Sequence, residues 1–139
     1  MSMFPAIGIA GTGLEVDQTW IDAIGGNVAN AEDAVTPGQP VYRDKEIVAA
    51  EAPRATGPGS SSAGDGVEVK GIALGSSQGI LTYDPGNPIA NKQGYVTYPD
   101  VNVGHEMTSL VEAQVSYEVD SKVLQNSTDA YNAILQIKP

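Results

Sequence analysis

The chain ends with a long stretch, from about Gly104 to Gln136, that contains no proline and no glycine after its first residue. Within it, mostly apolar side chains recur every seven residues, at Val103, Leu110, Tyr117, Leu124 and Tyr131. A second set lies between them, at Met107, Gln114, Ser121, Thr128 and Leu135, and the stripe is broadened by Val111, Val115, Val123 and Ile134. Because a heptad pattern of about 33 residues far exceeds the mean helix of about 11–12, it predicts a member of a coiled coil or helical bundle.

A second heptad pattern lies near the N-terminus, where Ile7, Leu14, Ile21 and Val28 alternate with Ala10, Ile24 and Ala31. We predict a helix over about 12–31, with Thr12 as the N-cap of a capping box. Asp17 occupies one of the alternate positions of this pattern. It therefore either meets a polar partner or the apolar face turns toward Val16 and Trp20.

The middle of the chain is divided by residues that break regular structure. Gly and Pro, at 16 and 9 of the 139 residues, exceed their usual share and lie outside the long C-terminal stretch. Three short runs with strand-like patterns, 41–49, 67–74 and 80–83, predict one small antiparallel sheet. The segment 52–66 is rich in Gly, Ser and Pro, which predicts a flexible loop.

These patterns predict an α+β chain with three segments. Residues 1–32 form an N-terminal helical assembly segment, residues 33–102 a β-rich middle module, and residues 103–139 a long C-terminal helix. One small sheet cannot cover two long apolar helices, and pairing the helices with each other still leaves the longer one with an exposed stripe. Since a large exposed apolar stripe marks an interaction surface, we expect the terminal helices to form an intermolecular coiled coil or helical bundle.

The charge of the chain argues against two classes of partner. Seven Lys+Arg against 17 Asp+Glu give a net charge of −10, which repels phosphate backbones and anionic lipid headgroups. No stretch is long and apolar enough for a membrane helix. We also expect no cleaved secretory leader, because the N-terminal residues lack a basic n-region.

Residues suited to chemistry are sparse. The sequence has no cysteine, and it contains neither a calcium-loop motif nor a dinucleotide fingerprint. The only histidine, His105, lies beside Glu106 at the start of a predicted helix, where a surface or capping role is commoner than catalysis. We therefore expect no catalytic residues, no cofactor and no metal.

Three segments of the chain resemble segments of one known protein family. The first runs from Leu14 to Ala31 and ends in Asn27-Val28-Ala29-Asn30-Ala31. It resembles the N-terminal helix, with its N-x-A-N-A signature, of the bacterial flagellar rod and hook subunits, the axial protein family. The second contains Tyr83-Asp84-Pro85-Gly86-Asn87-Pro88 and Pro99-Asp100-Val101-Asn102-Val103 and is similar to a stretch of the proximal rod subunits. The third, from Glu106 to Leu124, is similar to their C-terminal helix.

The resemblance implies a structural subunit of the proximal rod in the flagellar basal body. Such subunits polymerise helically with other rod proteins and form the drive shaft that transmits torque to the distal rod and hook. The implied partners are other proximal and distal rod proteins, the membrane ring and its rod adaptor at the base, and the flagellar type III export apparatus. The implied location is the rod in the periplasm and cell-wall region, reached without a cleaved signal peptide.

The expected assembly interface lies on the heptad faces of both terminal helices. It comprises Leu14, Trp20, Ile21, Ile24, Asn27, Val28 and Asn30, together with Met107, Leu110, Gln114, Tyr117, Leu124, Tyr131 and Leu135. The two asparagines either bind backbone carbonyls of a neighbouring subunit or only end the helix. Two alternative functions remain open: another axial subunit, such as a different rod protein or a hook-like adaptor, and a secreted monomeric binding module.

Overall fold

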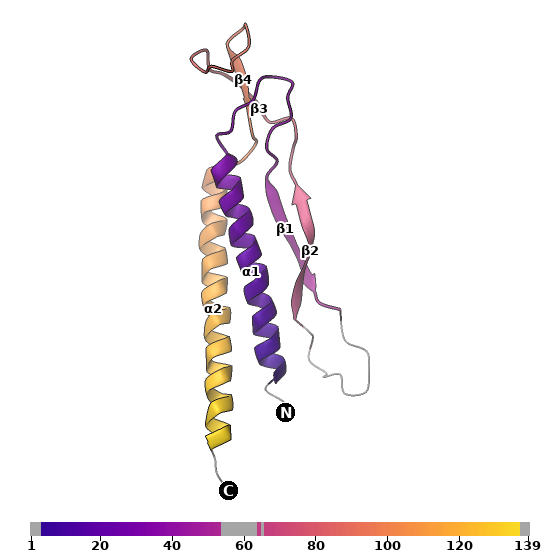
Figure 1. The fold of residues 1–139 in the computed structure, drawn as a ribbon, viewed down its shortest axis with the longest axis vertical. Helices are drawn as coiled ribbons and strands as arrows, with labels where there is room; N and C mark the ends of the chain where they lie inside the picture. The colour runs from indigo at the N-terminus through magenta and orange to yellow at the C-terminus, as the bar shows by residue number, and fades with distance from the viewer. Residues whose placement is uncertain (1–3, 54–63, 65, 137–139) are drawn as a thin grey trace.

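The computed structural model describes residues 4–53, 64 and 66–136 of the chain. Two long helices, α1 (Phe4–Asn30) and α2 (Val103–Gln136), lie side by side and antiparallel, so that the start of α1 and the end of α2 are at the same end of the molecule (Figure 1). Four strands lie between them in sequence: β1 (Lys45–Glu51), β2 (Val67–Leu74), β3 (Ile80–Tyr83) and β4 (Tyr95–Tyr98). The predicted α+β class is confirmed. Within the described ranges, no helix combines the length and apolar character that a membrane span requires.

The first helix begins at Phe4, well before the predicted start at Thr12. The Thr12 hydroxyl does not cap it: the hydroxyl donates to the carbonyl of Ile9 at 2.7 Å and accepts the backbone N–H of Val67, at the start of β2, at 3.1 Å. The N-cap prediction is wrong because the first turns of α1 gain packing partners that a capping pattern does not report. Ala10, for example, is only 5% exposed, and packing of an apolar face supplies most helix stability in proteins.

The second helix begins where the sequence predicts. The side-chain carbonyl of Asn102 accepts the N–H of His105 at 3.1 Å, and its backbone carbonyl accepts the N–H of Glu106 at 2.9 Å. Asparagine is a preferred N-cap residue, and the carboxylate of Glu106 in the first turn suits the positive end of the helix dipole. From this cap α2 runs for 34 residues, or about 50 Å at roughly 1.5 Å per residue.

The strands form two separate two-stranded antiparallel sheets, β1–β2 and β3–β4, rather than the single predicted sheet. The β1–β2 hairpin lies alongside α1, whereas β3–β4 lies beyond the end of the helix pair (Figure 1). β1 begins at Lys45 instead of Val41, and β4 had not been predicted as a strand. Most of the predicted flexible loop 52–66 falls outside the described residues.

The segment that follows α1 pairs with β4. Val35 exchanges two backbone hydrogen bonds with Thr97 of β4, at 2.8 and 2.9 Å. Val41 and Val96 are 6% and 0% exposed beside Thr97, which is 5% exposed. β4 is therefore held by a residue far away in the sequence, and a four-residue strand carries too little pattern to reveal such a partner.

Gly79 occupies a position at which a side chain cannot be accommodated. Its φ is +63°, and a Cβ there would lie 2.3 Å from the carbonyl oxygen of Tyr98. Replacing Gly79 with alanine should therefore lower the free energy of unfolding by roughly 1–3 kcal/mol, measured by urea denaturation. Gly86→Ala is the matched control, because the nearest atom would lie 3.8 Å from its Cβ. Equal stability of the two variants would contradict the prediction.

Candidate assembly surface

Small and polar side chains hold α1 and α2 together. Ser109 and Ala113 are the buried residues of α2, and farther along this helix Asp120 lies so close to α1 that a Cβ at Gly13 would be 3.0 Å from its carboxyl carbon. Each of these residues lies one position before a residue of the predicted apolar stripe: Ser109 precedes Leu110, Ala113 precedes Gln114 and Asp120 precedes Ser121. The physical reason is that small side chains let the two helices approach closely. We call this contact between α1 and α2 the seam, and the larger apolar side chains of α2 lie outside it.

Asp17 of α1 lies inside this seam. It is 6% exposed, and its Oδ2 atom has no hydrogen-bond partner. Burial raises the pKa of its carboxyl above the ordinary value, a hydrogen bond from the Ser116 side chain partly opposes this, and the negative charge of Asp120 raises the pKa further. Of the two possibilities seen in the sequence, Asp17 thus meets a polar partner.

The Asp17→Asn variant should be more stable than the wild type at pH 7, with a smaller gain at pH 4. A carboxyl whose pKa is higher in the folded chain than in the unfolded chain binds its proton more readily when folded. The Asp17 carboxyl therefore adds to the free energy of unfolding at low pH. This gain is lost as the pH rises from the pKa of the unfolded chain, near 3.8, through the raised pKa of the folded chain. Asparagine is uncharged at either pH and escapes this loss.

The measurement is Tm at both pH values. Asp22→Asn, which removes an exposed carboxylate from the same helix, controls for the change in net charge. A gain at pH 4 that exceeds the gain at pH 7 would contradict the sign of the shift.

Asn27 joins α1, β1 and α2. It is 2% exposed. Its Nδ2 atom donates to the carbonyl of Lys45 at 3.0 Å and to Oε2 of Glu106 at 3.2 Å. Its Oδ1 atom accepts the N–H of Lys45 at 2.8 Å and the hydroxyl of Tyr42 at 3.1 Å. The side-chain amide therefore uses its full hydrogen-bonding capacity, and it binds the backbone of Lys45 much as a neighbouring strand would.

The second asparagine of the N-x-A-N-A segment has a local role. Asn30 is half-buried, and its Nδ2 atom donates to the carbonyl of Gly26 at 2.7 Å. That bond fits the expected role at the end of a helix, whereas Asn27 binds a backbone carbonyl of its own chain. Contacts of either residue with a neighbouring subunit stay a prediction.

Helix α2 also carries a row of exposed apolar side chains at every fourth residue, the last of which, Val123, lines a groove beside α1. We call it the α2 apolar row; its members, which are between 41% and 59% exposed, are Val103, Met107, Val111, Val115, Val119 and Val123. Residues four apart are neighbours on a helix surface. Each step turns about 40° around the axis, so the row winds through about 200° from its first to its last member. A single straight helix beside α2 cannot cover all of it.

The residues expected at the interface differ in exposure. Ile24 and Asn27 are buried; Leu14, Trp20, Ile21, Val28, Asn30, Leu110, Leu124 and Tyr131 are half-buried; Met107, Gln114, Tyr117 and Leu135 are exposed. Leu14 and Tyr117 line the same shallow groove along the helix pair. Of the α2 apolar row, only Met107 was among the expected interface residues. Val103, Val111, Val115 and Val123 had been predicted only as members of the apolar stripe, and Val119 was not singled out at all.

The described residues include no group of three or more His, Cys, Asp or Glu side chains that could hold a metal ion. His105 is exposed in the first turn of α2. The features that stand out in this part of the chain are surfaces for packing: the seam, the site of Asn27 and the α2 apolar row.

Several known proteins are similar to this chain over most of its length. Residues 92–137 match the family model described as flagellar basal body rod FlgEFG protein C-terminal. A flagellar basal-body rod protein FlgC from Borreliella burgdorferi is 33% identical over 99% of this chain and 98% of that protein. Proteins of the same name from Agrobacterium fabrum and Yersinia enterocolitica are 36% and 34% identical, over 87% and 91% of this chain and 84% and 91% of their own lengths. The chain belongs to the FlgC family of flagellar basal-body rod proteins.

Proposed function

We propose that the chain is a structural subunit of the flagellar proximal rod, which polymerises helically with other rod proteins and transmits torque to the distal rod and hook. The observation that carries this proposal is the likeness to FlgC proteins across 99% of the chain. The α2 apolar row provides a physical means of assembly, because it is a large exposed surface on a helix that already has one partner.

The winding of the row fits a helical assembly. Full burial of a large apolar side chain contributes roughly 1.5–3 kcal/mol, and members of the row, already half covered, would contribute part of that each. Because the row turns around α2, its covering requires neighbours on more than one side. Contacts between different surfaces of identical or similar subunits build helical filaments when they do not close into a ring.

The proposed partners follow from the same function. They are the other proximal and distal rod proteins, the membrane ring with its rod adaptor, and the flagellar type III export apparatus. The proposed location is the rod in the periplasm and cell-wall region. The proposed role is structural and involves no catalysis.

A different axial subunit is the second candidate. The family model matched by residues 92–137 is named after FlgE, FlgF and FlgG, so the C-terminal segment by itself does not separate one axial subunit from another. The full-length likeness to FlgC proteins favours the proximal rod. No observation favours a secreted monomeric binding module.

The proposal is tested by deleting the gene that encodes the chain. Cells of the deletion strain should be non-motile, and electron cryotomography should show basal bodies that lack a completed rod. A plasmid copy of the wild-type gene should restore both, and density for the chain should lie in the proximal rod of purified basal bodies. Complete rods in the deletion strain would rule the proposal out.

A further inference from the structure

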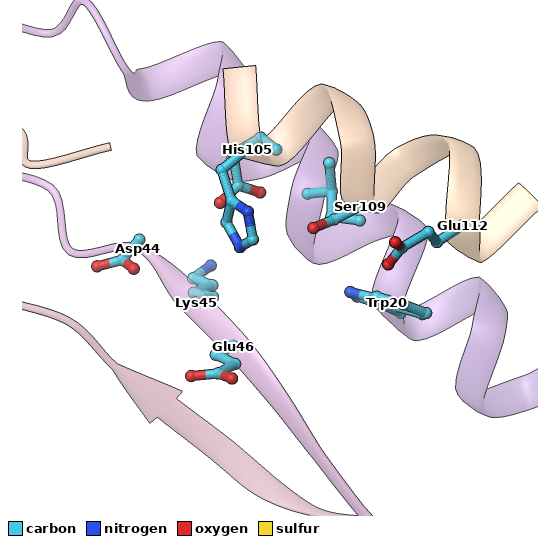
Figure 2. Close-up of a pocket in the computed structure, with 9 residues that line it drawn as sticks. Trp20, Asp44, Lys45, Glu46, His105, Ser109 and Glu112 are labelled. Carbon is cyan, nitrogen blue, oxygen red and sulfur yellow. The ribbon is translucent and has the colours of Figure 1, made fainter. Parts of the chain in front are cut away.

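A cleft of about 340 Å³ lies where α1, α2 and the start of β1 meet. Figure 2 shows Trp20, Ser109 and Glu112 on the side formed by the two helices, and Asp44, Lys45 and Glu46 on the side formed by β1 and the residue before it. This volume is at the lower end of the roughly 300–1,000 Å³ of small-molecule sites. The cleft is therefore large enough for one long side chain.

The cleft carries negative charge that the chain itself does not neutralise. It is lined by four carboxylates, those of Asp44, Glu46, Glu106 and Glu112. The two ion pairs among the described residues lie elsewhere, at Glu68–Lys70 and Glu118–Lys122. Two basic side chains, Lys45 and His105, also line the cleft, and the Lys45 ammonium lies 5.8 Å from the centroid of the Tyr42 ring. An incoming cation would thus meet carboxylates that form no ion pair within the described chain.

Two further side chains in the cleft suit a ligand that is both polar and flat. Ser109 is 9% exposed, it lines the cleft, and its hydroxyl bonds to no described residue. The hydroxyl therefore faces the cleft and is available to accept a hydrogen bond from a ligand. Trp20 also lines the cleft. Among aromatic side chains, tryptophan binds a cation above its ring most strongly.

We propose that this cleft receives an arginine side chain of a neighbouring rod subunit. A guanidinium is planar, always charged and rich in N–H donors, so it suits a cleft that is lined by the carboxylates of Glu46 and Glu112, the Ser109 hydroxyl and the Trp20 ring. A lysine ammonium has no flat face for the indole. A metal ion is a poorer occupant, because no group of three or more acidic or histidine side chains in the described residues is placed to hold one.

The contact would also reduce the repulsion between subunits that each carry a net charge of −10. This inference rests on the proposed rod function, because it requires an adjacent subunit. It goes beyond that function by naming the chemistry of one contact.

Trp20 makes the proposal measurable, because it is the only tryptophan of the chain. The full-length protein is titrated at constant ionic strength with N-acetyl-arginine amide and, separately, with N-acetyl-citrulline amide, which has the same length and a planar end group without charge. The arginine compound should change Trp20 fluorescence saturably, with a dissociation constant about tenfold lower than that of the citrulline compound.

The Glu46→Gln/Glu112→Gln variant should bind the arginine compound about tenfold more weakly than the wild type. The matched control, Glu15→Gln/Asp22→Asn, removes two exposed carboxylates of α1 that do not line the cleft, and it should bind as the wild type does. Circular dichroism of each variant checks that it is folded.

Equal responses to the two compounds, or wild-type binding by the Glu46→Gln/Glu112→Gln variant, would overturn the proposal. The titration needs no rod, so its failure would leave the proposed rod function standing. Complete rods in the gene-deletion strain would instead remove the rod function, whatever the titration shows.

Discussion

The Val111→Asp/Val119→Asp variant should fold with nearly the free energy of unfolding of the wild type, yet it should fail to build rods. Val111 and Val119 are 59% and 54% exposed at the centre of the α2 apolar row. In the single chain the new carboxylates would stay in water, and exposed substitutions of this kind usually change stability by less than about 0.5 kcal/mol. In an assembled rod the same carboxylates would be buried against apolar neighbours without partners, at a cost of several kcal/mol per ion.

Three measurements check this result: swimming in soft agar, electron microscopy of basal bodies, and urea denaturation of the purified chain. Ser121→Asp/Gln125→Asp is the control, because both residues are exposed on α2 and neither belongs to the row. It should swim and assemble as the wild type does. Complete rods built by the valine variant would show that the row is not an assembly surface.

Replacing Asn27 with alanine should lower the free energy of unfolding by roughly 2–5 kcal/mol. The change removes all four hydrogen bonds of the amide at once. It leaves the backbone N–H and carbonyl of Lys45 and a carboxylate oxygen of Glu106 without their partner. Because Asn27 is 2% exposed, water cannot readily replace the lost bonds.

Urea denaturation at pH 7 gives the measurement, and the neighbouring asparagine supplies the control. Asn30 makes one local bond, to the carbonyl of Gly26, so Asn30→Ala should cost less than about 1 kcal/mol. Asn27→Asp tests the donor separately, because it keeps the acceptor oxygens but loses both donated bonds, to the carbonyl of Lys45 and to Glu106, and adds a second negative charge. Similar losses for Asn27→Ala and Asn30→Ala would contradict the joining role of Asn27.

The helices could be predicted because their signal is local and repeated. The alternate positions of the first heptad, Ala10, Asp17 and Ile24, are all buried in the structure. Helix α2 was recognisable from its length without proline or glycine. The face of α2 that packs on α1 could not be predicted, because it depends on which side chains let the two backbones approach. Small residues such as Ser109 and Ala113 carry no apolar pattern.

The β module and the site of Asn27 were harder to predict for a different reason. Asn27 binds Lys45, Tyr42 and Glu106, which lie on separate elements. The pairing of Val35 with Thr97 likewise joins distant segments. Periodicity reports only the neighbours of a residue along its own element, so such contacts leave no trace in it. The cleft beside Trp20 arises in the same way, from three elements that meet only in the folded chain.

The antiparallel pairing of α1 and α2 also sets the order in which the chain can fold. The hydrogen bond between Asn27 and Glu106 joins residues 79 positions apart, and contacts of such high contact order form only after a long loop has closed. A chain that emerges from a ribosome or a narrow channel with its N-terminus first therefore carries α1 without its partner until α2 has followed. The seam can therefore close only after the middle of the chain and most of α2 have emerged.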